Sequence, residues 1–148
     1  MLSEEEVYNG AKNWLKRNGF TVIAGQPARG VDHLPVIEIK TRTGDKGSRE
    51  SYKPDLIALK DGAIYIIECK PAFNLPDYEK IQSVLNDSVR RRNLIFELNQ
   101  YKLLERNGLD EVESVKGMLA YSGKLETSHT DMSHLLVKTW TGSAELFY

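Results

Sequence analysis

Two short apolar runs joined by an aspartate and a glycine constrain the fold of this chain most strongly. The runs are Leu56 to Leu59 and Ala63 to Ile67, and Asp61-Gly62 lies between them. An Asp-Gly pair favours a tight two-residue hairpin, because both central residues of that turn need a positive φ. The sequence therefore predicts two antiparallel strands. The second is apolar on both of its faces, so we expect it to be an interior strand that is covered on both sides.

Charged residues stand at the open end of this predicted hairpin. Asp55 directly precedes the first strand, and Glu68 and Lys70 end the second. Side chains alternate between the faces of a strand, so Glu68 and Lys70 share a face, and folding the hairpin brings Asp55 beside Glu68. Two carboxylates at close range repel each other and raise each other's pKa. A divalent cation would remove this conflict, since Mg²⁺ binds through one or two carboxylates together with water and phosphate oxygens.

The pattern of these residues resembles a known signature. Pro54-Asp55, twelve further residues and then Glu68-Cys69-Lys70, on a hairpin between two helical segments, resemble the motif of the PD-(D/E)xK nuclease superfamily. The resemblance covers about residues 1–100. It implies a restriction-endonuclease-like α/β fold, with a mixed central β-sheet flanked by helices. Given the length of 148 residues, we expect one such domain over residues 1–148, with an extra β-hairpin at its C-terminal end.

The resemblance also implies roles for the residues of the motif. Asp55 and Glu68 would hold Mg²⁺, or Mn²⁺ in its place, and the backbone carbonyl of Cys69 would complete the metal shell. Lys70 would position the attacking water or stabilise charge in the transition state. The Cys69 side chain faces away from Glu68 and Lys70, so we expect it to be a small core residue and not a nucleophile.

Residues 3–18 form a predicted amphipathic helix, with Ser3 as its N-cap and Glu6 completing a capping box. Relatives in the superfamily carry a glutamate on the inner face of this helix, which corresponds to Glu4 here. Glu4 is therefore a candidate catalytic residue, which would bind a second metal or orient the nucleophile, and Glu5 is the next choice. The alternative is that these glutamates only complement the helix dipole.

The charge balance indicates where DNA contacts could lie. The chain has 20 Lys and Arg against 21 Asp and Glu, a net charge of −1, so any contact must come from local basic patches. Two patches and one residue implied by the resemblance are candidates: Arg42, Lys46, Arg49 and Lys53 in a polar segment, the cluster Arg90, Arg91 and Arg92, and Gln100. A solvated loop and a solvated helix face are the alternatives.

These observations predict metal-dependent hydrolysis of DNA phosphodiester bonds by a Mg²⁺-dependent endonuclease. The size resembles that of archaeal Holliday-junction resolvases, which are compact dimers, so we expect a homodimer. The loop Gly25 to Gly30 lacks their Ser-rich glycine loop, so the substrate stays open between junctions, flaps and duplex sites. A small restriction endonuclease and a catalytically silent DNA-binding relative are the alternatives. With a single Cys and no long apolar segment, we expect a soluble, cytoplasmic protein without a membrane partner.

The rest of the chain suggests further elements and two motifs that we reject. Asp32, Glu38 and Lys40 form a second acidic motif, but only five residues separate Asp32 from Glu38, too few for two strands and a turn. His129 and His134 are not spaced to bind zinc from one helix face. Further elements are expected at 20–24 (strand), 36–41 (strand, antiparallel to the first), 77–106 (helical, capped by Asp77 and broken near 86–88), 112–121 (strand), and 135–140 with 144–148 (hairpin).

Overall fold

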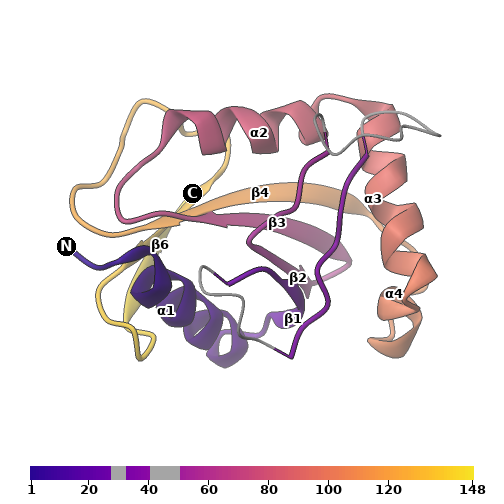
Figure 1. Ribbon diagram of the computed structural model, residues 1–148, viewed down its shortest axis with the longest axis horizontal. Helices are drawn as coiled ribbons and strands as arrows, with labels where there is room; N and C mark the ends of the chain where they lie inside the picture. The colour runs from indigo at the N-terminus through magenta and orange to yellow at the C-terminus, as the bar shows by residue number, and fades with distance from the viewer. Residues whose placement is uncertain (28–32, 41–50) are drawn as a thin grey trace.

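The computed structural model describes residues 1–27, 33–40 and 51–148 (Figure 1). The chain runs through a helix, three strands, three helices and three further strands. Their bounds are α1 Glu4–Arg17, β1 Thr21–Gly25, β2 Leu56–Lys60, β3 Ala63–Cys69, α2 Leu75–Leu85, α3 Ser88–Gln100, α4 Leu103–Arg106, β4 Ser114–Tyr121, β5 Ser133–Val137 and β6 Ala144–Phe147. The predicted α/β class is confirmed.

The strands form one six-stranded mixed sheet in the order β1-β2-β3-β4-β5-β6. β1, β2 and β3 pair antiparallel, β4 pairs parallel with β3 and with β5, and β6 returns antiparallel to β5. Helices flank both faces, with α1 on one side and α2 on the other (Figure 1). Two buried apolar clusters result, one under α1 and one under α2, α3 and α4.

The predicted central hairpin is confirmed. Asp61 and Gly62 have φ values of 50° and 80°, as the tight turn between β2 and β3 requires. β3 lies between β2 and β4, and its two faces belong to different cores. Ile64 and Ile66 pack in the cluster under α2, while Ile67 packs in the cluster under α1. The prediction of an interior strand is therefore confirmed as well.

The first helix begins as predicted. The Ser3 side chain accepts a hydrogen bond from the Glu6 N–H, and the Glu6 carboxylate accepts one from the Ser3 N–H, at 3.1 and 3.0 Å. This capping box satisfies two backbone donors that a helix otherwise leaves without partners. The α1 stripe of Val7, Ala11 and Leu15 is fully buried against the sheet.

The strand expected over residues 36–41 is wrong. In the described part of this segment, the only strand-type contact is one isolated antiparallel bridge between Ile39 and Tyr52. The alternation of apolar residues predicted burial correctly, because Ile37 and Ile39 are both buried. They pack into the core under α2 and α3 without a neighbouring strand. Alternation reports a buried side of an extended chain, and it does not report a hydrogen-bonded partner.

The helical region differs from the prediction at its start. α2 begins at Leu75, and its N-cap is Asn74, whose side-chain oxygen accepts a hydrogen bond from the Asp77 N–H at 3.0 Å. The expectation that Asp77 caps the helix is therefore wrong, since Asp77 lies in the first turn and is buried. The predicted break is confirmed, because Asp87 caps a new helix, α3.

The C-terminal hairpin belongs to the sheet of the monomer. β5 joins β4, and β6 pairs with β5 through partners such as Leu135 with Leu146. Phe147 packs against the core, whereas Trp140 and Tyr148 are exposed. Of the helices in the described ranges, none has the length and apolar character needed to cross a membrane.

Gly10 determines how closely α1 approaches the C-terminal hairpin. A Cβ at this position would lie 2.6 Å from Val137 Cγ1 and would also meet the Thr139 carbonyl oxygen. We expect Gly10→Ala to destabilise the fold by about 1–3 kcal/mol through overpacking, although alanine normally favours a helix by about 1 kcal/mol. Urea unfolding measures this. The exposed substitution Lys16→Ala is the control, and a more stable Gly10→Ala variant would contradict the close contact.

Candidate active site

An open cleft of about 290 Å³ lies at the end of β3 and the start of β2. It collects four of the residues named from the sequence as catalytic together with one predicted DNA contact. The lining residues are Glu4, Gln26, Pro27, Lys53, Asp55, Glu68, Lys70, Asp77 and Lys80. They come from α1, from the segment after β1, from the segment before β2, from β3 and its end, and from α2, so the cleft exists only once these elements have packed together.

The carboxyl groups of Asp55 and Glu68 face each other across the hairpin. The register pairs Leu56 with Ile67, which places the preceding Asp55 opposite Glu68. Each carboxylate accepts a backbone hydrogen bond from the other strand. The Asp55 N–H donates to Glu68 Oε2 at 3.1 Å, and the Cys69 N–H donates to Asp55 Oδ2 at 2.8 Å. The backbone therefore fixes both side chains and leaves one oxygen of each without a backbone donor among the described residues.

Burial disfavours the ionised forms of Asp55 and Glu68. The side chain of Glu68 is 4 % exposed, and its pKa rises to about 9, first through burial and then through its hydrogen bond to Asp55 and the Asp55 charge. The pKa of Asp55 is also raised, again mainly by burial. Without a cation, the pair is best described as two carboxyl groups that share a proton at neutral pH.

Lys70 forms an ion pair with Glu4 of α1. Its Nζ lies 2.9 Å from Glu4 Oε1, and both side chains are about two-fifths exposed. This hydrogen bond is the main reason why the pKa of Lys70 is raised, so its ammonium group stays protonated. Glu4 lines the cleft, which corresponds to the inner-face position expected from the sequence, whereas Glu5 does not line it.

The Cys69 side chain lies in the apolar cluster under α1 and is 1 % exposed. Burial raises the pKa of its thiol well above the ordinary value. A buried thiol of this kind is a poor nucleophile, in line with the role as a core residue expected from the sequence. The Cys69 carbonyl as a metal ligand stays a prediction.

Two residues beside Glu68 were missed by sequence reasoning. Asp77 is 2 % exposed and lines the cleft, and burial raises its pKa. A signal was available, because Asp77, Ile81 and Val84 recur at the spacing of one helix face and all three are buried. The Tyr52 hydroxyl is also buried near Glu68, and no described residue forms a well-aligned hydrogen bond with it. Its position in a polar stretch gave no comparable signal.

The predicted DNA contacts are only partly near the cleft. Lys53 lines it, while Arg42, Lys46 and Arg49 lie outside the described residues. The cluster of Arg90, Arg91 and Arg92 begins α3, beyond the far end of α2, whose 11 residues span about 16 Å. Its first two arginines brace the corner between α2 and α3, through the Ser83 hydroxyl and the Leu85 carbonyl. Gln100 lines a separate cavity at the other end of α3, together with Tyr101 and Arg106.

The histidines rejected as zinc ligands have packing partners. His134 is buried, with its Nδ1 2.7 Å from the Tyr121 hydroxyl and its Nε2 bonded to the His129 carbonyl. Asp131 accepts a hydrogen bond from the Tyr78 hydroxyl. Both ring nitrogens of His134 are therefore used within the fold.

Comparisons with protein-family models, with curated proteins and with solved structures found no match to this chain. The carboxylate oxygens in the cleft are ligands of the kind that hard divalent cations bind. Asp55 and Glu68 each present a further oxygen in a buried site where their charges conflict. In the described ranges, no three His, Cys, Asp or Glu side chains already converge on one point. A cation between two carboxylates would complete its coordination shell with water, as Mg²⁺ commonly does in proteins.

The pKa of Glu68 predicts how the metal-free protein responds to pH. Because the folded-state pKa is raised from 4.5 to about 9, the folded state binds a proton that the unfolded state releases, so stability falls as pH rises through this range. We expect Glu68→Gln to flatten this fall and to stabilise the metal-free protein at pH 8 by about 1–2 kcal/mol. Denaturant unfolding at pH 5 and pH 8 in EDTA measures it. Glu38→Gln, outside the cleft, is the control, and equal pH slopes in all three proteins would contradict the buried pair.

Proposed function

We propose that this protein is a metal-dependent endonuclease of the PD-(D/E)xK type that hydrolyses DNA phosphodiester bonds. The observation that carries the proposal is the buried pair of Asp55 and Glu68, held opposite each other by backbone hydrogen bonds, with the Lys70 ammonium in the same open cleft. Buried like charges destabilise a fold unless they serve a ligand, so this arrangement favours a cation-binding function over a structural one.

The order of helices and strands along the chain also supports the proposed PD-(D/E)xK nuclease. A helix, an antiparallel meander of β1, β2 and β3, a helical region and a further strand parallel to β3 follow one another. The acidic pair lies directly before the second strand of the meander, at Asp55, and near the end of the third, at Glu68. We therefore propose a restriction-endonuclease-like fold, to which β5 and β6 add an extra C-terminal hairpin.

In this proposal, Asp55 and Glu68 hold Mg²⁺ or Mn²⁺, and the Cys69 carbonyl adds a ligand. When bound, the ion would polarise a phosphoryl oxygen and lower the pKa of a coordinated water. Asp55 and Glu68 supply negative charge at a fixed position, and binding displaces the proton that they share. Metal affinity should therefore rise with pH.

Lys70 is suited to stabilising charge and unsuited to accepting a proton. Its ammonium group is held at 2.9 Å by Glu4, and its raised pKa keeps it protonated at neutral pH. A fixed cation beside the reacting phosphate stabilises the negative charge that develops in the transition state. Glu4 would thus orient Lys70, which adds to the roles considered for it in metal binding and in orienting the nucleophile.

A DNA phosphate backbone suits the open form of the cleft and its rim. Lys53 and Lys80 are exposed and line the cleft from the segment before β2 and from α2. Such lysines contact phosphates without reading sequence, so the substrate stays open between junction, flap and duplex DNA. One centre can cut one strand, and a homodimer would supply two. A small restriction endonuclease and a catalytically silent DNA-binding relative are the alternatives.

The proposal predicts Mg²⁺-dependent nicking of at least one DNA from a panel of plasmid, single-stranded, flap and four-way-junction substrates. Asp55→Asn should abolish cleavage, because it removes charge from the cation site. Lys70→Met should lower the rate by about 100-fold or more, the usual loss when one group that stabilises the transition state is removed. Gel assays with Mg²⁺, Mn²⁺ and EDTA measure both effects.

The rejected motif provides a matched control for this experiment. Glu38→Gln changes the same residue type in the second Glu-x-Lys sequence, which does not line the cleft. It should cleave at the parental rate. DNA binding by the parent without nicking of any substrate would favour the silent relative over the nuclease.

The position of the basic residues predicts which of them bind DNA near the cleft. Replacing Lys53 and Lys80 by Ala should weaken binding uniformly across sequences and lower the slope of log K against log salt by about 2, close to one unit per phosphate contact. Fluorescence anisotropy over a salt series measures the slope. An Ala triple variant of Arg90, Arg91 and Arg92 tests the distant cluster, and an unchanged slope there would show that this cluster does not contact the DNA.

A further inference from the structure

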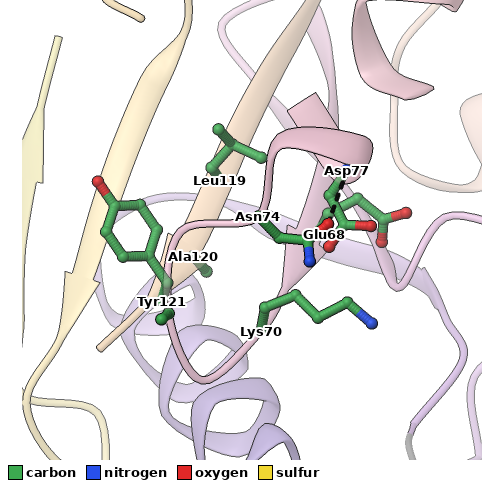
Figure 2. A pocket seen from close by; sticks show the side chains of 8 residues that line it. Glu68, Lys70, Asn74, Asp77, Leu119, Ala120 and Tyr121 are labelled. Carbon is green, nitrogen blue, oxygen red and sulfur yellow. Dashed lines mark hydrogen bonds between the residues drawn. The ribbon is translucent and has the colours of Figure 1, made fainter. Parts of the chain in front are cut away.

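A second cavity lies at the corner between α3 and α4, at one end of the molecule (Figure 1). Its volume is about 620 Å³, within the range of about 300–1,000 Å³ that is typical of small-molecule sites. We call it the corner cavity, and it is lined by residues 33–35, 100–103 and 106. The acidic end of the cleft, where Glu68 and Asp77 lie, is a separate place, and no residue lines both (Figure 2).

The backbone of Lys102 has a conformation that lysine seldom adopts. Its φ is 55° and its ψ is 28°, in the left-handed region. The other described residues with a positive φ are five glycines and Asp61 of the hairpin turn, which are residue types that reach this region more readily. Glycine or asparagine at position 102 would therefore form the same corner with less strain. The turn does not explain why the side chain here is that of lysine.

Two cationic side chains meet at this corner without an acidic partner. The Arg106 N–H donates to the Lys102 carbonyl at 3.0 Å, so the two residues lie one helical turn apart, where like charges repel each other. Both are exposed and line the corner cavity, and no described acidic residue lines it. No carboxylate of the described residues lies within ion-pair distance of either side chain. An anionic ligand would balance this charge.

The remaining surface of the corner cavity suits a flat aromatic group. The Tyr101 side chain is 48 % exposed, and nucleobases of every kind stack on such rings. Leu34, Pro35 and Leu103 add apolar surface beside it. The Gln100 carboxamide carries both a donor and an acceptor, which match the neighbouring donor and acceptor on the edge of adenine. An inorganic anion would use the two cations and leave this surface without a contact.

We propose that the corner cavity binds a nucleotide, with its base against Tyr101 and its phosphate between Lys102 and Arg106. Arginine binds phosphate oxygens through two parallel N–H groups, and lysine binds them as a point charge. Strained residues are common at ligand sites, so a phosphate contact accounts for the lysine at position 102. A free nucleotide and a nucleotide of single-stranded DNA share this chemistry. The inference does not rest on the proposed nuclease activity, because the cleft contributes no residue to the cavity.

The test is isothermal titration calorimetry of the full chain in EDTA with dAMP, deoxyadenosine and inorganic phosphate. We expect one dAMP per chain, bound at least about tenfold more tightly than deoxyadenosine or phosphate, because only dAMP fills both parts of the cavity. Tyr101→Ala should weaken dAMP binding by about tenfold, since it removes the stacking surface, and it should leave phosphate binding unchanged.

Position 102 provides the sharper variant. Lys102→Gly removes the ammonium group and relieves the left-handed backbone, so it should bind dAMP about tenfold more weakly and yet melt at or above the parental temperature. Lys102→Arg keeps the charge and should keep the parental affinity. The matched control is Asp61→Gly, at the other described non-glycine residue with a positive φ and outside the cavity, which should bind dAMP as the parent does. Should Lys102→Gly fail to fold, Lys102→Asn replaces it.

A single-stranded dA oligonucleotide separates the two sources of the ligand. Tighter binding of the oligonucleotide than of dAMP, weakened in Lys102→Gly, identifies a DNA strand, and dAMP binding at least as tight identifies a free nucleotide; both support the site. Equal affinities for dAMP and phosphate, binding of neither dAMP nor the oligonucleotide, or parental affinities in Lys102→Gly overturn it. Failure of the parent to nick any DNA overturns the proposed function alone.

Discussion

The antiparallel register between β2 and β3 places Asp55 opposite Glu68, and the rest of the site depends on that pairing. The backbone N–H groups of Asp55 and Cys69 each bind the carboxylate of the opposite strand. A slip of one residue would turn every side chain of β3 to the other face and would bury Glu68 in the apolar cluster under α1. The tight Asp61-Gly62 turn prevents this slip, because it fixes how the two strands align.

The helices on the two faces of the sheet turn this pair into a site. α1 covers one face and contributes Glu4 to hold Lys70, while α2 covers the other and contributes Asp77. Both residues lie in the first turn of their helices. The positive end of a helix dipole favours carboxylates there, which partly offsets the repulsion among them. The two helices that complete the core thus also complete the cleft.

The buried carboxylates of the cleft lower the stability of the metal-free fold. Glu68 and Asp77 are buried carboxylates in a domain whose other buried side chains are almost all apolar in the described residues. Burial, and after it the charges of neighbouring carboxylates, raise their pKa values, so the free energy of unfolding of the metal-free protein is lowered at neutral pH. A hard cation that bound only the folded state would raise the free energy of unfolding again, so that ligand binding and stability would be coupled.

The sequence by itself determined the local features. The turn at Asp61-Gly62, the capping box at Ser3 and the meeting of Asp55 with Glu68 depend on contacts within a hairpin or a helix turn, and these follow from periodicity and turn chemistry. Only the tertiary structure decided that Asp77 faces Glu68, that residues 36–40 pack without a strand partner, and that Arg90 braces a helix corner away from the cleft. Each of these depends on how α2 and α3 pack against a distant part of the sheet, and side-chain burial between elements far apart in the chain leaves only a faint trace in the local pattern of residues.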